Sequence, residues 1–184
     1  HYFYAKLCAW KSANCQKDLG KSPHALIDTF VFPGFIEKDR TYTGLWETLP
    51  AEEQGKVYFV PNLHGFPRRE LLSTYQKLRK SPKRFLLKED FLTMSDYFYA
   101  LTHSFRIFGW KFPTASFEEV NVSQLIREEL WSGVGYNSAV LGLLNYRFAE
   151  RLKKNGVSMN IVINRFENQV IDKGWNAGFK QFFP

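Results

Sequence analysis

Residues 141–182 read LGLLNYRFAERLKKNGVSMNIVINRFENQVIDKGWNAGFKQF. An apolar stripe at helical spacing ends at Lys153, Lys154 and Gly156, which are typical of a last helical turn and its C-terminal cap. The alternating stretch 157–166 predicts a strand, and a second helical stripe follows with Asn168 as its expected N-cap. Helix, strand and helix with short connections indicate an α/β fold with a parallel sheet.

These patterns also predict which side chains are buried. The first helix should bury one stripe, the strand one face, and the second helix another stripe. In chain order the residues are Leu141, Leu144, Phe148 and Leu152; Val157, Met159, Ile161 and Ile163; and Ile171, Trp175, Phe179 and Phe182.

The preceding residues supply the other elements of the fold. We expect strands at 24–32 and 56–63, a short helix after Pro50, an amphipathic helix at 69–80, helical structure over most of 85–110, and a helix at 121–131. This organisation predicts one Rossmann-like α/β domain over residues 1–184, with a short, mostly parallel sheet flanked by several helices.

Two glycines lie inside the last predicted helix. Gly174 and Gly178 are four residues apart, so they share one helix face. Each costs about 1 kcal/mol of helix propensity relative to alanine. Close packing of this face on the sheet or on a neighbouring helix would offset that cost.

Several classes of site have no signature in this chain. Neither G-x-G-x-x-G nor G-x-x-x-x-G-K-[ST] occurs, so we expect no nucleotide cofactor site within these residues. The four histidines have no metal-ligand spacing, and we expect Cys8 and Cys15 to be free, buried thiols rather than a disulfide. No stretch reaches the roughly 18 apolar residues of a membrane span. The chain is therefore expected to be cytoplasmic.

The positive charge is concentrated in residues 68–88. This segment holds eight basic residues and one acid, which accounts for the whole net charge of +7. A solvated helix face is one interpretation, and attraction to an anionic membrane surface is another, because each Lys or Arg there contributes about 1 kcal/mol. Nucleic acid is not an expected partner, since no binding-module motif is present.

Polar residues gather where the predicted strand at 157–166 meets the next helix. In open parallel sheets, ligands bind beyond the carboxyl ends of strands, so Arg165, Asn168 and Gln169 are candidate binding residues. Glu167 could accept a proton from a hydroxyl group. The alternative is a solvated carboxylate stabilised by the helix dipole, by less than about 1 kcal/mol.

A second group of candidate residues follows the strand at 56–63. His64, together with Arg68 and Arg69, could meet an anionic group of a substrate. A turn histidine without a functional role is the alternative.

The stretch RFENQVIDKGWNAGFKQFFP, residues 165–184, resembles a segment of the bacterial capsule and O-antigen glycosyltransferase-like proteins. These proteins are of the GT-B kind, with two Rossmann domains, and their "ENQ…DKG/A…G…YP" stretch follows a strand late in the N-terminal half. Residues 85–101 and 45–50 resemble the same family more loosely. The matching residues are Glu167, Asn168, Gln169, Asp172, Lys173, Gly178 and Pro184.

The resemblance implies the acceptor-side, N-terminal half of a glycosyltransferase for cell-surface polysaccharide, inactive alone. Glu167 would be the catalytic base, with Arg165, Asn168, Gln169, His64 and Arg68 binding a saccharide or lipid-linked saccharide. A nucleotide-sugar donor would bind a C-terminal half outside this chain. The basic segment would suit peripheral association with the inner face of the membrane. The alternative is a non-catalytic module that binds anionic membrane or polyanion through residues 68–88.

Overall fold

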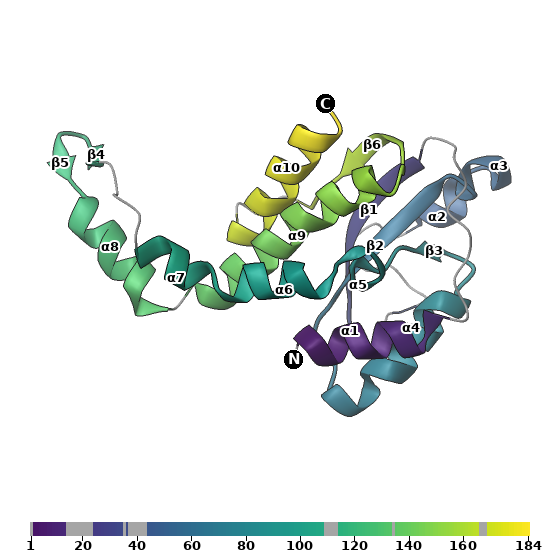
Figure 1. Cartoon of the computed structure of the whole chain (residues 1–184). Helices are drawn as coiled ribbons and strands as arrows, with labels where there is room; N and C mark the ends of the chain where they lie inside the picture. Colours follow the sequence, from purple (N-terminus) through teal and green to yellow (C-terminus); the bar gives the residue numbers. More distant parts are fainter. Residues whose placement is uncertain are drawn as a thin grey trace.

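The centre of the molecule is a four-stranded parallel sheet in the order β3-β2-β1-β6 (Figure 1). The structure is a computed structural model that describes residues 2–13, 24–34, 36, 44–108, 114–133, 135–165 and 169–184. The parallel sheet with helices around it confirms the predicted Rossmann-like α/β fold. Its strands are β1 (His24–Val31), β2 (Val57–Leu63), β3 (Arg84–Phe85) and β6 (Met159–Ile163).

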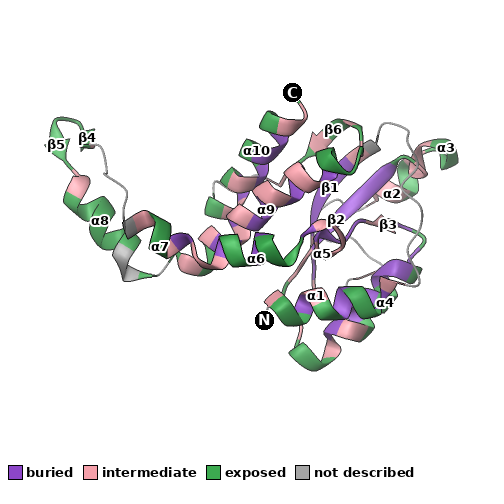
Figure 2. Ribbon diagram, viewed as in Figure 1, coloured by how far each residue is buried: buried purple, intermediate pink, exposed green. Residues whose placement is uncertain are grey.

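Alternate side chains of the strands pack into different clusters. Leu26 and Val60 belong to the largest core cluster, which also contains residues of α6 (Met94–Leu101), α9 (Tyr136–Lys154) and α10 (Val170–Phe182). Ile27 and Phe59 are the adjacent residues on the same strands, so their side chains point to the other face of the sheet, where they pack with α2 (Leu45–Thr48). Helices therefore cover both faces of the sheet, and β1 and β2 are its most buried strands (Figure 2).

The remaining helices pack beside this sheet or connect its strands. Val31 at the end of β1 joins a third cluster with α1 (Tyr2–Lys11) and α4 (Leu71–Lys80). α3 (Ala51–Gln54) begins after Pro50, as predicted, and the 3-10 turn η2 (Arg68–Glu70) leads into α4. Cys8 on α1 is a buried free thiol, whereas Cys15 lies outside the described residues.

The glycines of α10 are explained by its contact with α9. A Cβ on Gly174 would lie 1.9 Å from the carbonyl oxygen of Gly142, and one on Gly178 would lie 3.0 Å from Ala149 Cβ and Tyr146 Cα. The two helix backbones can approach this closely only because both positions lack a side chain. The predicted close packing of this helix face on a neighbouring helix is confirmed.

The predicted burial of the last strand is only partly right. Val157 and Met159 pack against the main core, but Ile161 and Ile163 are 55% and 37% exposed, and Val162 packs inward instead. The register against β1 shifts between the pairs His24–Met159 and Ala25–Ile161. A one-residue irregularity reverses the face to which the following side chains point. β6 also lies at the edge of the sheet, so fewer neighbouring elements cover the side chains that point away from the main core.

The segment 85–108 is mostly helical, as predicted, but it is divided into three helices. Phe85 pairs with β2 as part of β3, and the chain then forms α5 (Lys88–Phe91), α6 and α7 (His103–Phe108). A capping box separates α5 from α6, because Asp96 accepts hydrogen bonds from the Thr93 backbone N–H and side chain, both at 2.8 Å. Helices thus account for most of residues 85–108, as the sequence predicts, although they form three helices and the segment begins in β3.

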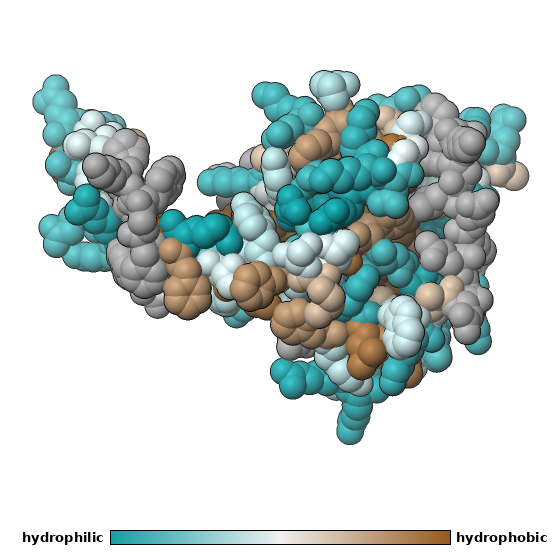
Figure 3. All heavy atoms as spheres, viewed as in Figure 1, coloured by the Kyte–Doolittle hydropathy of each residue, from teal (hydrophilic) through white to brown (hydrophobic). Residues whose placement is uncertain are grey.

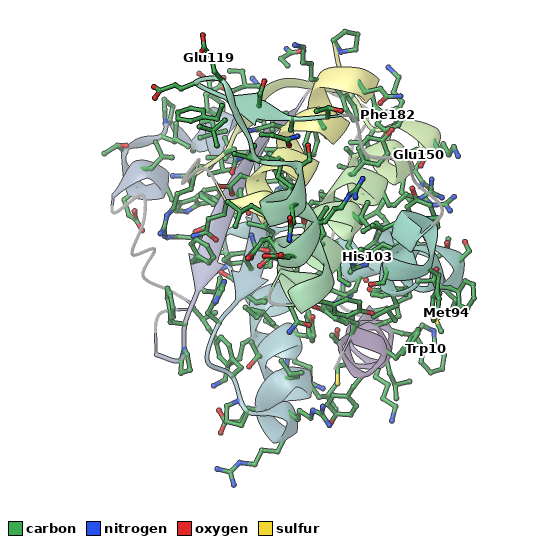
Figure 4. All side chains as sticks on the ribbon, turned by 90° about the vertical axis from the view of Figure 1, so that its left-hand side faces the viewer. Trp10, Met94, His103, Glu119, Glu150 and Phe182 are labelled. Atoms are coloured by element: carbon green, nitrogen blue, oxygen red, sulfur yellow. The ribbon has the colours of Figure 1, made fainter. Side chains whose placement is uncertain are left out.

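An arm projects from the α/β body beyond α7 (Figures 1 and 3). It contains the hairpin β4 (Ser116–Phe117) and β5 (Val120–Asn121), followed by α8 (Ser123–Ser132). Figure 4, in which the arm faces the viewer, labels Glu119 in the hairpin turn. Apolar side chains on this arm are exposed, among them Phe117, Leu125 and Leu130.

Candidate functional site

The order of the strands reverses direction between β1 and β6. The chain passes from β1 to β2 to β3 in one direction across the sheet and then returns to β6 on the other side of β1. In open parallel sheets, ligands bind at the carboxyl ends of the strands that flank such a reversal. The residues at the carboxyl ends of β1, β2 and β6 are therefore the candidates for a binding site.

Two of the predicted residues meet at this edge through a shared aromatic ring. The Arg165 guanidinium lies 4.3 Å from the centre of the Phe30 ring, and the His64 ring packs edge-on against the same ring at 4.5 Å. Loss of hydration and the positive charges of Lys88 and Arg165 lower the pKa of His64. His64 is therefore favoured in its neutral form, which can accept or donate a hydrogen bond.

A chain of polar side chains lies behind this aromatic edge. Asn62 on β2 donates a hydrogen bond to the carboxylate of Asp28 on β1. Lys88 at the start of α5 donates to the Asn62 side-chain oxygen at 2.6 Å and to that of Asn145 on α9 at 2.9 Å. Asn145 in turn donates to the Ile171 carbonyl oxygen at 3.3 Å. The network therefore connects two strands with α5, α9 and α10.

Burial changes the proton affinity of both charged members of this network. Loss of hydration raises the pKa of Asp28 to about 6, with Lys88 and Arg165 opposing the rise and Asp172 adding to it. Burial also lowers the pKa of Lys88, against the attraction of Asp28 and Glu89. A carboxyl group that titrates near neutral pH can exchange a proton under working conditions.

A cavity of about 370 Å³ opens beside Lys88 and Asn62. It lies between the end of β2 and helices α1, α4, α5 and α9. Its volume is at the lower end of the range for small-molecule sites, about 300–1,000 Å³. The carboxyl edge of the sheet thus combines a cavity with a buried amine and amide.

The structure places the other predicted site residues differently. Gln169 is the N-cap of α10, with its backbone N–H donating to Asp172 at 3.0 Å, so Asn168 is not the N-cap as predicted. The helix begins one residue later because Asp172 then stands where it can complete a capping box. Glu167 and Asn168 themselves lie outside the described residues. Arg68 is exposed in η2.

Four of the eight basic side chains of residues 68–88 are buried or half-buried and have structural partners. Arg79 is buried and pairs with Asp90 at 2.6 Å, Lys83 pairs with Glu47 at 3.4 Å, and Arg84 donates to the Tyr58 hydroxyl at 2.7 Å. Lys88 belongs to the network described above. The exposed cations of the segment are Arg68, Arg69, Lys77 and Lys80.

Sequence reasoning missed the members of the buried network. Asp28 and Asn62 stand in otherwise apolar strands, and Asn145 stands in an apolar helix. A polar residue inside a buried run must find a partner, which is the signal that could have identified them. Lys88 was counted only as part of the basic segment.

The described residues show neither a metal site nor a membrane-spanning helix. Within the part of the chain that the structure describes, no group of three or more His, Cys, Asp or Glu side chains could hold a metal ion. No helix among these residues is both long and apolar enough to cross a membrane. No family model matches the chain, and neither a curated protein nor a solved structure is significantly similar to it.

Proposed function

We propose that this chain is the acceptor-side half of a glycosyltransferase of bacterial cell-surface polysaccharide synthesis. The observation that carries the proposal is the cavity at the carboxyl edge of the sheet, beside the buried Lys88 and Asn62. The resemblance of residues 165–184 to the capsule and O-antigen enzymes adds the substrate class. The acceptor is a saccharide or a lipid-linked saccharide.

The proposed reaction needs a base and a leaving group. An acceptor hydroxyl attacks the anomeric carbon of a nucleotide sugar, the bond to the nucleoside diphosphate breaks, and the hydroxyl proton passes to the base. Glu167, two residues after Arg165, is the proposed base. The donor would bind a second domain, because residues 1–184 contain no phosphate-binding motif.

The competing proposal is a binding module that uses residues 68–88. Four exposed cations remain for that purpose, and Arg69 lies 3.7 Å from the carboxylate of Glu70. The same four residues would suit weak attraction to the inner face of a membrane that carries lipid-linked acceptors. The exposed charge therefore fits either proposal, whereas the cavity favours the enzyme.

The test is sugar-nucleotide turnover by the full gene product, with Glu167→Gln compared against the wild type. Removal of a general base should lower kcat by about 10²–10⁴-fold while the circular dichroism spectrum stays unchanged. Glu52→Gln, an exposed carboxylate on α3, is the matched control and should keep full activity. Unchanged turnover in Glu167→Gln would remove the base assignment, and no turnover with any donor would contradict the enzyme proposal.

A further inference from the structure

The cavity beside Lys88 has a hydrogen-bond donor that its neighbours do not use. An ammonium group carries three N–H bonds. Two of them donate to the side-chain oxygens of Asn62 and Asn145, and the structure gives Lys88 no further hydrogen bond among the described residues. Since Lys88 lines the cavity, the third N–H is available to a group that enters it.

An acceptor group stands in the same wall. Glu89, the next residue of α5, also lines the cavity, and burial together with its negative charge raises the pKa of the neighbouring Tyr75. A carboxylate offers about four acceptor positions, so Glu89 has capacity for donors of a ligand. A donor and an acceptor therefore lie on consecutive residues of one helix.

The opposite walls are aromatic and apolar. Tyr2, Phe66 and Tyr97 line the cavity together with leucines from β2, α4 and α9 and with Leu92, which follows α5. Tyr97 is almost fully buried. Such walls favour a ligand that has apolar C–H faces as well as hydrogen-bonding groups.

We propose that this cavity binds one neutral pyranose unit of the acceptor saccharide. Sugar hydroxyls can both donate to Glu89 and accept from Lys88, while the C–H face of the ring packs on the aromatic walls. An anion is disfavoured, because Asp28 already balances the charge of Lys88 and Glu89 would repel it. The inference rests on the proposed function and names the substrate class of its acceptor site.

The test is saturation-transfer NMR on the chain with the methyl glycosides of glucose, galactose, mannose and N-acetylglucosamine. We expect at least one glycoside to bind. Glu89→Gln, which keeps the shape but removes the charge, should weaken binding at least tenfold, because bonds to a charged acceptor are the strong ones. Leu141→Phe, which narrows the cavity without touching a polar group, should do the same.

Glu52→Gln is the control and should change the affinity less than twofold. Circular dichroism and thermal unfolding establish that each variant is folded. The inference is overturned if no glycoside binds, if both cavity variants bind as tightly as the wild type, or if inorganic phosphate displaces the glycoside by occupying Lys88.

The outcomes separate this inference from the proposed function. Glycoside binding that depends on Glu89, without sugar transfer by the full gene product, would retain the pyranose site and reject the transferase. Sugar transfer with an unchanged acceptor KM in Glu89→Gln would retain the transferase and reject the site.

Discussion

Asp28 is an acid placed where water cannot solvate its charge. Only 6% of the residue is exposed, and its pKa is raised from 3.8 to about 6. A raised pKa means that the folded state holds the proton more tightly than the unfolded state does. The contribution of Asp28 to stability is therefore full below about pH 4 and is lost as the pH rises through about 6.

The substitution Asp28→Asn should remove this pH dependence. Asparagine keeps an oxygen that can accept the hydrogen bond from Asn62 and carries no charge. The variant should gain roughly 2 kcal/mol of unfolding free energy relative to the wild type on going from pH 4 to pH 7.5. Urea denaturation at several pH values measures the difference. A difference that is constant across this range would contradict the raised pKa.

The pKa of Asp96 is shifted in the opposite direction, because several groups donate hydrogen bonds to its carboxylate. Burial acts to raise its pKa, but hydrogen bonds from Arg151, Thr93 and Arg147 hold the pKa well below the usual range. A lowered pKa contributes stability above the ordinary value of about 4, and this is lost as the pH falls through the folded pKa. Asp96→Asn should therefore lower the free energy of unfolding at pH 7. As the pH falls, this free energy should decrease less in the variant than in the wild type. Acid titration of the wild type and the variant, followed by circular dichroism, measures the difference. An equal loss of stability in both proteins as the pH falls would contradict the lowered pKa.

At the scale of elements, the contact between α9 and α10 depends on the absence of side chains. Gly174→Ala would place a Cβ 1.9 Å from the carbonyl oxygen of Gly142, so the helices must separate. We expect a loss of about 3 kcal/mol or more, since a forced backbone shift adds to overpacking. Thermal unfolding measures the loss. Ala177→Gly on the exposed side of α10 is the control and should cost about 1 kcal/mol.

The sequence predicted the helices and strands better than the way in which they pair and pack. Periodicity identified β1, β2, α9 and α10, and the glycine spacing predicted the close helix contact. It could not predict the register shift before Ala25, which turns Ile161 and Ile163 outward, because that shift depends on pairing with a distant strand. The network around Lys88 was missed for a related reason: its members are far apart in the chain and meet only in the fold.

At the scale of the whole molecule, stability should reside in the α/β body rather than in the arm. Leu125 on α8 is 66% exposed, whereas Leu152 on α9 is fully buried. Leu125→Ala should change the free energy of unfolding by less than about 0.5 kcal/mol. Leu152→Ala should cost about 2–5 kcal/mol. Urea denaturation of both variants tests the contrast, and a large loss in Leu125→Ala would mean that the arm packs against the body.

Two surfaces of the molecule compete as binding sites. The carboxyl edge of the sheet offers the cavity, the aromatic edge at Phe30 and the buried network, whereas α4 and η2 offer exposed cations. A saccharide that uses hydroxyl groups should choose the first, and a polyanion the second. The proposed function therefore depends on which of these two surfaces binds a saccharide.

The most direct test is a titration of the isotope-labelled chain with methyl glycosides, followed by amide NMR, with polyphosphate in a parallel titration. Glycosides should shift the amide signals of Asn62, His64 and Lys88 and leave those of Lys77 and Lys80 unchanged. Glycosides that perturb no residue at the carboxyl edge, while polyphosphate shifts Lys77 and Lys80, would contradict this prediction and identify the basic helix face as the binding surface.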